Sequence, residues 1–395
     1  MMATACVKCE TIINNSLTTG HCCSCLKLLS HQSPGNHVVA EESRPVEKTD
    51  SDVAELRRTS SLLTIEEART FLKDVLRLED DDVIAAVNGM KKERLDFLNR
   101  IILAIYHATP FQSISLLSMD PDTRHVPTWL EIKDAMFTKQ GGLCLVLNAF
   151  LHELLLALGF EVYIAYSLDY FDINCDHIVV IAENVSAPGD RYLVDVGFGY
   201  PIFEALSLDF DGDHSPAYEM SYWTIRLARD RGEDDCDRGE DGCDRFVVES
   251  YDGGIEERRT LQNVEFIEDM IIPQNARWLE EFTFQTRPYS LEEFLKKMHS
   301  LYCEPSDSYF LNNLHAVMFK NQVAFAFKNS ALLLEDDSGN LKAEVLTSDE
   351  RLRDRILEYF PQFTSQTVNA ALRNLRSNQK QFPHLNAAKI KHRIE

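Results

Sequence analysis

The sequence predicts an α+β fold, because helical and strand-like patterns occupy separate stretches of the chain. Apolar residues recur at helical spacing in segments between residues 64 and 158. Short β-branched and aromatic segments, separated by turn-rich breaks, then run from 161 to 334. A last helical stretch at 348–360 closes the region. Helices and strands segregated in this way are typical of the α+β class.

The composition supports a full hydrophobic core without a membrane segment. The chain has 395 residues and is 45% hydrophobic. It contains no run of about 18 apolar residues, so no membrane span is expected. The first ten residues lack an apolar stretch after a basic start, which predicts no secretory signal and a cytoplasmic location. The ten cysteines are therefore expected to be reduced thiols, metal ligands or a nucleophile, and not a disulfide framework.

The charge balance limits the partners. Acidic residues number 63 against 40 basic ones, and the formal net charge is −23. General nucleic-acid binding needs a basic surface that replaces the counterions of the phosphates. A nucleic-acid partner is therefore not expected.

Four regions can be separated along the chain. Residues 1–29 are rich in cysteine, and 30–60 are polar with proline and glycine, as expected for a flexible linker. The globular domain is expected at 61–363. Residues 364–395 are polar and turn basic, which predicts a loose tail or a short helix.

The first region carries two Cys-x-x-Cys pairs separated by twelve residues. Two such pairs suit a tetrahedral zinc site with four cysteine ligands, and the spacing is close to that of a zinc ribbon. His21 and Cys23 offer alternative ligands, and a metal-free, thiol-rich segment is the other interpretation. Four thiolates would leave no open position on the metal, so we expect a structural role or a protein partner. The predicted zinc ligands are Cys6, Cys9, Cys22 and Cys25.

Local signals place the elements of the globular domain. Thr64 and Glu67 have the spacing of a capping box ahead of an apolar helix. The helix predicted from 144 to 158 is almost entirely apolar and stops at Gly159, a good residue for a helix C-terminus. Two more helices are expected at 95–105 and 348–360. Strands are expected at 161–168, 177–182, 192–196, 246–251, 282–284, 315–319, 323–327 and 331–334.

A tandem repeat interrupts the strand region. Asp-Arg-Gly-Glu-Asp-Asp-Cys is followed by Asp-Arg-Gly-Glu-Asp-Gly-Cys at 230–243, within an insertion at 229–245. Its acidic, glycine-bearing and non-aromatic composition predicts a solvated insertion between two strands. The alternative is a cation or partner site made of its carboxylates and two cysteines, but it lacks the ligand spacing of an EF-hand.

The motif Gly-Gly-Leu-Cys at 141–144 stands directly before the apolar helix. Two glycines allow a sharp entry turn. They also place Cys144 in the first helical turn, where unpaired N–H groups and the positive end of the helix dipole favour a thiolate. A nucleophile is one interpretation, and a small buried core residue beside a tight turn is the other.

Two polar residues lie at the ends of apolar strands. His177 opens the segment His-Ile-Val-Val-Ile, and Asp195 lies in Tyr-Leu-Val-Asp-Val-Gly-Phe-Gly. A carboxylate in an apolar strand is costly without a partner, and a histidine is an obvious one. Taken singly, His177 could be a strand-end histidine and Asp195 could cap the turn at Gly197. With Cys144 they also form the set nucleophile, base and orienting acid.

With these residues the chain resembles the arylamine N-acetyltransferases. That family shows Gly-Gly-x-Cys followed by Asn, Leu-Gly-Phe after the helix, a histidine-led strand, and Val-Asp-x-Gly-Phe-Gly. This chain has 141–144 with Asn148, then 158–160, His177 and 194–199. The resemblance covers about 62–363, with partial support from His107, Pro110-Phe111, 282–294 and 306–310.

The chain also departs from the family pattern. Gln140 replaces an arginine, Gln112 a glutamate and Ser113 an asparagine, which suggests a Gln112–Gln140 hydrogen bond in place of an ion pair. Val146 replaces a polar residue, and Asn174 replaces a glycine in the loop that the family uses near the acyl donor. These changes leave the three catalytic candidates intact and bear on the choice of acyl donor and acceptor.

The resemblance implies a papain-like core of helical bundle, β-barrel and α/β lid. It implies acetyl-CoA as co-substrate, whose phosphates would need a local basic patch or exposed backbone N–H groups. Acetyl would pass through Cys144 to a small aromatic amine, hydrazine or hydroxylamine, with His177 as base and Asp195 orienting it. Phe111, Phe198 and Tyr200 are expected to wall the site, with Asn174 near the acyl donor. The alternatives are a Cys-His-Asp hydrolase, a transglutaminase-like enzyme, or a catalytically silent scaffold.

Overall fold

The computed structural model describes residues 61–78, 91–170, 177–230, 244–251, 278–336, 339 and 341–385. The predicted zinc segment, the linker and Asn174 lie outside these residues, as do residues 231–243 of the acidic repeat. The strands on either side of that repeat, β7 and β8, pair with each other. The repeat thus separates two neighbouring strands of one sheet, in agreement with a strand-to-strand insertion.

The helices fall into an N-terminal and a C-terminal set. The first set begins with the capping box of Thr64 and Glu67, whose two reciprocal hydrogen bonds are both present. It comprises α3 (Ile65–Thr70), the π-helix η1 (Phe71–Val75), α5 (Lys91–Ala108), α6 (Ile114–Ser118), α7 (Trp129–Phe137) and α8 (Cys144–Ala157). The second comprises α10 (Leu291–Cys303), α11 (Tyr309–Asn312), α12 (Asp349–Tyr359), α13 (Ser365–Gln381) and the 3₁₀ turn η3 (Pro383–Leu385).

The described strands form two antiparallel sheets. The larger has the order β5-β4-β3-β2-β9-β8-β7-β6, and the smaller β1-β10-β11-β12-β13. The larger is built from β2 (Glu161–Tyr170), β3 (Ile178–Glu183), β4 (Arg191–Val194), β5 (Leu206–Ser207), β6 (Tyr218–Met220), β7 (Trp223–Arg229), β8 (Arg245–Tyr251) and β9 (Trp278–Gln285). The smaller is built from β1 (Phe111–Gln112), β10 (His315–Lys320), β11 (Val323–Lys328), β12 (Ala331–Glu335) and β13 (Leu341–Val345).

Helix α8 is the central element of the described region. Every residue from Cys144 to Leu155 is buried, and the helix contacts α7, β2 and β3. A helix that is apolar on all sides is stable only when other elements cover every face. Glu153 at its far end accepts hydrogen bonds from the Ser61 hydroxyl and the Leu62 N–H, so the start of the domain is fastened to α8.

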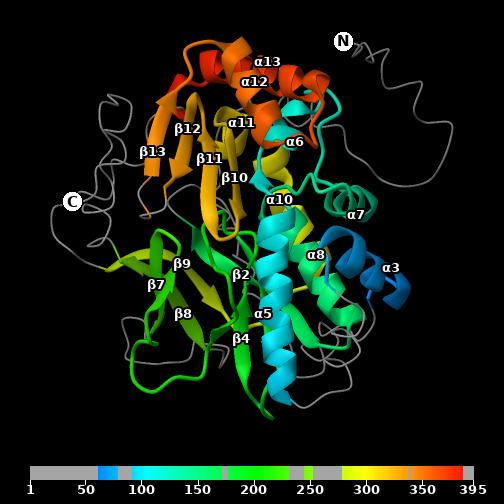
Figure 1. The fold of residues 1–395 in the computed structure, drawn as a ribbon, viewed down its shortest axis with the longest axis vertical. Helices are drawn as coiled ribbons and strands as arrows, with labels where there is room; N and C mark the ends of the chain where they lie inside the picture. The colour runs from blue at the N-terminus through cyan, green and yellow to red at the C-terminus, as the bar shows by residue number, and fades with distance from the viewer. Residues whose placement is uncertain are drawn as a thin grey trace, which may run out of the picture. The chain divides into compact units, whose positions relative to one another are not determined.

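The α+β prediction is confirmed, and the predicted helices and strands agree with the structure to within a few residues at each end. Helices α6, α7, α10 and α11 and strands β1, β5, β6, β7 and β13 were not predicted. For residues 364–395 the sequence predicted a loose tail or a short helix; in the structure residues 365–381 form a helix of 17 residues, α13, which packs on α6, α11 and α12. In Figure 1, α12 and α13 lie at the same end as the smaller sheet. The residues that α13 buries, Val368, Ala371, Leu372 and Leu375, recur at helical spacing that its polar composition conceals.

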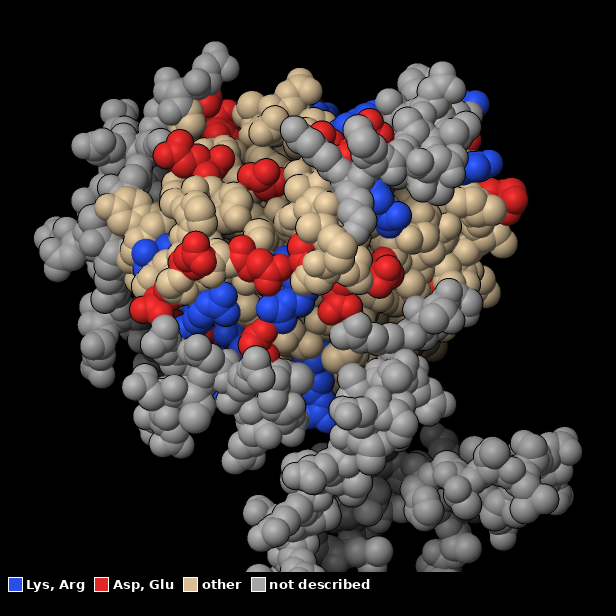
Figure 2. Space-filling view, turned by 90° about the horizontal axis from the view of Figure 1, so that it is seen from below, with Lys and Arg blue, Asp and Glu red and all other residues tan. Residues whose placement is uncertain are grey.

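Among the described residues, no helix is both long enough and apolar enough to cross a bilayer. Acidic and basic side chains are interspersed on the face shown in Figure 2.

Candidate active site

Three elements bring Cys144, His177 and Asp195 together. Cys144 is the first residue of α8, His177 directly precedes β3, and Asp195 directly follows β4. Strands β3 and β4 pair, with Val180 opposite Val194, so the two polar residues reach the same part of the sheet. Because α8 packs on β3, its N-terminus faces them. All three side chains are buried.

The imidazole of His177 lies between a carboxylate and a thiol. Its Nε2 is 2.7 Å from Oδ2 of Asp195, which leaves Nδ1 for the Cys144 thiol, with which the ring also interacts. Burial alone would lower the pKa of His177, but Asp195 first and Cys144 second outweigh it and raise this pKa to about 10. At neutral pH the geometry therefore favours an imidazolium between two groups that can carry negative charge.

Asn148 links the helix to both strands. It lies one helical turn after Cys144, and its Nδ2 donates to the Ile178 carbonyl and to Oδ1 of Asp195, each at 2.7 Å. Its Oδ1 accepts from the Val196 N–H at 2.9 Å. The Gly197 N–H donates to the same carboxylate oxygen at 2.8 Å. The buried carboxylate is thereby fully hydrogen-bonded, which offsets the cost of its desolvation.

Two glycines are required by close approach. A Cβ on Gly197 would lie 2.8 Å from Cα of Cys144 and from Nδ2 of Asn148. Gly141 has φ +63°, and a Cβ there would lie 2.0 Å from the Pro110 carbonyl oxygen. The first glycine lets the strand after Asp195 touch the helix start, and the second permits the predicted sharp entry turn.

A buried tyrosine fixes the chain beyond Asp195. The Tyr106 hydroxyl lies 2.9 Å from the Tyr200 carbonyl and 3.1 Å from the Asp195 carbonyl, and it accepts from the Ile202 N–H. Burial, with a smaller effect of the Asp195 charge, raises the pKa of Tyr106 well above its ordinary value, so it stays a neutral donor. Sequence reasoning missed this residue, since it lies in an apolar helical stripe with no local polar motif.

Aromatic rings surround the imidazole. Phe282 of β9 lies 5.0 Å from the His177 ring and Phe198 5.8 Å, between ring centroids. Tyr200 packs on Phe198 at 5.1 Å, and a Cβ on Gly199 would lie 3.1 Å from the Phe111 ring. The structure thus gathers the three predicted wall residues Phe111, Phe198 and Tyr200 near the site, and it adds Phe282, which the sequence indicated only as part of a strand.

The predicted hydrogen bond between Gln112 and Gln140 is present, although it involves the backbone of Gln140. The Gln112 side chain donates from Nε2 to the backbone carbonyl of Gln140 at 3.2 Å, and not to its side chain. It also donates to the Ser115 hydroxyl at 2.8 Å. The Gln140 carbonyl is within reach because Gly142 pairs with Phe111 across the same turn.

The predicted zinc ligands belong to a part of the chain that the structure does not describe. Within the ranges that it does cover, no group of three or more His, Cys, Asp or Glu residues could hold a metal ion. Cys6, Cys9, Cys22 and Cys25 fall outside those ranges. The zinc site therefore stays a prediction.

The comparison with known families identifies the class of protein. A family model described as N-acetyltransferase matches residues 94–362, which include the whole cluster around His177. The protein is therefore an acyltransferase. The chain belongs to the arylamine N-acetyltransferase family.

Solved structures share the fold. The arylamine N-acetyltransferase of Mycobacterium marinum in complex with CoA matches with a TM-score of 0.55 and 17% identity, over 77% of this chain and 97% of that one. The enzyme of Nocardia farcinica matches with 0.55 and 20% identity, over 76% and 95%. That of Salmonella typhimurium matches with 0.55 and 13% identity, over 79% and 99%. Among curated protein sequences, none matches this chain.

Proposed function

We propose that this protein transfers an acetyl group from acetyl-CoA to an arylamine, hydrazine or N-hydroxyarylamine through an acetyl-cysteine intermediate. The observation that carries the proposal is the buried row of Cys144, His177 and Asp195, in which the imidazole interacts with both other groups. The structural relative solved with CoA supports the choice of acyl donor. A cytoplasmic location and a papain-like arrangement of bundle, barrel and lid are parts of the same proposal.

The first step acylates the cysteine. The Cys144 thiolate attacks the thioester carbonyl, the new C–S bond forms, and the bond to the sulfur of CoA breaks. His177 gives its proton to the departing CoA thiolate. The N–H of Cys144, which has no helical partner because it is first in α8, is a candidate donor to the oxyanion.

The second step releases the product. The acceptor nitrogen attacks the acetyl carbonyl of Cys144 while Nδ1 of His177 takes its proton, and the cysteine leaves as a thiolate. Asp195 holds Nε2 throughout, so that Nδ1 keeps facing the sulfur. Phe198 and Phe282 pack against the imidazole and help to keep water from the acetyl-enzyme.

Intact mass after mixing with acetyl-CoA tests the proposal. We expect one added acetyl group, located on Cys144, which disappears on addition of 4-aminobenzoate or an aromatic hydrazine. The Cys144→Ala variant should gain none. Loss of the acetyl group in water as fast as with amine would indicate a hydrolase, and no acetylation of a folded protein would indicate a scaffold.

The cysteine pairs at 6–25 are proposed to hold a structural zinc ion, independently of acyl transfer. The metal content of the full chain should approach one zinc per protein and fall in the double variant Cys6→Ser, Cys9→Ser. Acetyl transfer should survive that change, since the family match begins at residue 94. A zinc content near zero in protein purified without chelators would remove this proposal.

A further inference from the structure

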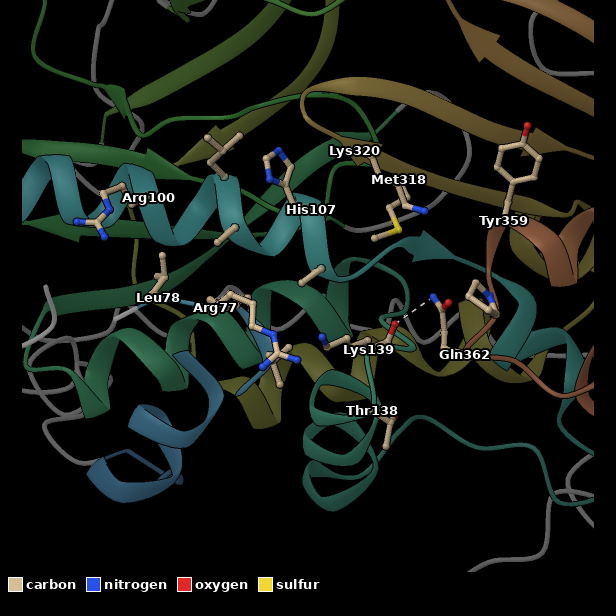
Figure 3. Close-up of a pocket in the computed structure, with 16 residues that line it drawn as sticks. Arg77, Leu78, Arg100, His107, Thr138, Lys139, Met318, Lys320, Tyr359 and Gln362 are labelled. Atoms are coloured by element: carbon tan, nitrogen blue, oxygen red, sulfur yellow. Dashed lines mark hydrogen bonds between the residues drawn. The ribbon is translucent and has the colours of Figure 1, made fainter. Parts of the chain in front are cut away.

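The structure has a pocket that none of the three proposed catalytic residues lines. Its volume is about 770 Å³, within the usual range of small-molecule sites of roughly 300–1,000 Å³. Its walls come from the end of η1, from α5, from the residues after α7, from β10 and from the residues around the end of α12 (Figure 3). Neither Cys144, His177 nor Asp195 lines it.

The charges among the described lining residues of this pocket are all of one sign. Four cationic side chains line it, and no aspartate or glutamate is among those residues. The chain as a whole has more acidic than basic residues, 63 against 40. A lining chosen at random from this composition would contain more acidic than basic side chains. The four are Arg77, Arg100, Lys139 and Lys320.

Three of these cations have no carboxylate partner in the part of the chain that the structure describes. There, Arg77, Lys139 and Lys320 form no ion pair, and Lys320 lies over the Phe325 ring at 5.3 Å. Arg376, outside the pocket, is by contrast paired with Asp349 at 2.7 Å. Uncompensated cations around a concave surface raise the local positive potential and attract anions.

Two of the cations lie just after the end of a helical element, Arg77 after η1 and Lys139 after α7. Arg77 and Lys139 both have left-handed φ values, 61° and 62°. The Lys139 carbonyl accepts a hydrogen bond from Nε2 of Gln362 at 3.1 Å. In Figure 3 the side chains of Arg77 and Lys139 point toward one another. An anion placed between them would be attracted by both charges.

The remaining lining suits an organic group. Leu103, Ala104 and Ala108 of α5, with Met318 of β10, form an apolar wall. His107, also in the lining, has an Nε2 that is buried without a hydrogen-bond partner in the described part of the chain. A buried polar atom in this state is costly unless a partner reaches it. The pocket therefore combines cations, an unsatisfied hydrogen-bonding group and an apolar surface.

We propose that this pocket binds an organic phosphate of nucleotide size, with its phosphates between Arg77, Lys139 and Lys320 and its organic part on the apolar wall of α5. The same chemistry is found in the nucleotide portion of CoA and in a free nucleotide. Only the assignment to CoA would rest on the proposed acetyl transfer; binding itself does not.

Calorimetric titration of the full-length protein tests binding directly. The probes are adenosine 3′,5′-bisphosphate, ATP and inorganic phosphate at low ionic strength. We expect at least one nucleotide to bind, at least tenfold more tightly than inorganic phosphate, and more weakly as salt rises. Arg77→Gln, Lys139→Gln and Lys320→Gln should each raise its Kd at least tenfold. The matched control is Lys342→Gln, an exposed lysine outside the pocket that pairs with Asp336, and its Kd should not change.

The KM for acetyl-CoA separates the two sources. If the pocket holds the nucleotide portion of CoA, the three pocket variants should raise that KM in parallel with the Kd of the bisphosphate. If it holds a free nucleotide, the KM should stay unchanged while the Kd rises. Binding that persists equally in all variants, or no binding of any probe at millimolar concentration, would overturn the proposal. Cys144→Ala protein should still bind, so an inactive enzyme does not obscure the result.

Discussion

Two histidines of this protein occupy similar positions and have opposite acid–base properties. His177 directly precedes β3 and His315 begins β10, and both lie against phenylalanine rings. Burial lowers the pKa of His315 to about 3, with a further contribution from the Lys328 charge. For His177 the same effect of burial is outweighed by Asp195 and Cys144, and its pKa rises to about 10. A desolvated imidazole without a carboxylate partner stays neutral, whereas a buried carboxylate at 2.7 Å makes it a cation.

Removing the charged histidine should have the largest effect. In His177→Ala the thiol loses its base and its counter-ion, so the rate of Cys144 acetylation should fall roughly 10³–10⁴-fold. Quench-flow with intact mass detection measures this rate. His125→Ala, which removes an exposed histidine that pairs with Glu131, serves as the control. A fall of less than tenfold in the acetylation rate of a folded His177→Ala protein would contradict the role of His177 as the base for Cys144.

Removing the side chain that supports the carboxylate comes next. Asn148→Ala deletes three buried hydrogen bonds around Asp195. We expect the free energy of unfolding to fall by about 2–4 kcal/mol, measured by urea denaturation. Asn99→Ala is a matched control, because its side chain accepts a single bond from the Ala205 N–H. Equal losses in the two variants would show that Asn148 contributes no more than an ordinary hydrogen bond.

Crowding the contact between helix and strand should cost less. A Cβ on Gly197 meets both Cys144 and Asn148, so Gly197→Ala should destabilise the protein by about 1–3 kcal/mol and slow acetylation of Cys144. Gly212→Ala is the comparison, since a Cβ there meets nothing within 4 Å and only the φ of +79° is unfavourable. It should leave the acetylation rate unchanged. An unaltered rate in Gly197→Ala would mean that the contact is not needed for the geometry.

His315, the neutral histidine, should make the free energy of unfolding fall as the pH is lowered. The folded pKa of His315 lies below the ordinary 6.5, so the unfolded chain takes up the proton first as the pH falls. Its contribution to stability is thus present above about pH 6.5 and is lost progressively toward pH 3. Between pH 7.5 and 5.5, His315→Phe should lose about 1 kcal/mol less unfolding free energy than the wild type. An identical pH profile for the two proteins would refute the neutral state of His315.

Elements with local sequence signals could be predicted. The capping box of Thr64 and Glu67, the apolar helix after Gly142 and the short β-branched and aromatic strands depend on neighbours in the sequence, and all are present. Helix α13 could not be predicted from composition, because its polar face hides the buried stripe of Val368 and Leu372. Which faces become buried depends on packing against α6 and α12, and the sequence does not record that packing.

The three candidate residues of the site could be proposed from the sequence, but the hydrogen bonds that hold them in place could not. Cys144, His177 and Asp195 could be found from their motifs. The bridge made by Asn148 spans 30 to 48 residues, and the Tyr106 contacts span 89 and 94, so neither leaves a local pattern. The hydrogen bond from Gln112 goes to a backbone carbonyl because of the turn that Gly141 and Gly142 create, which residue identity alone cannot indicate.

The N-terminal end of α8 has a consequence for how the sequence around this site can change. One rigid segment carries both the sulfur of Cys144 and the amide of Asn148 that sets the direction of Asp195. A drift of this helix would displace nucleophile and orienting group together and so preserve their alignment. Substitutions elsewhere in the domain that shift this helix as a rigid body would therefore leave the spacing of Cys144 and Asn148 unchanged.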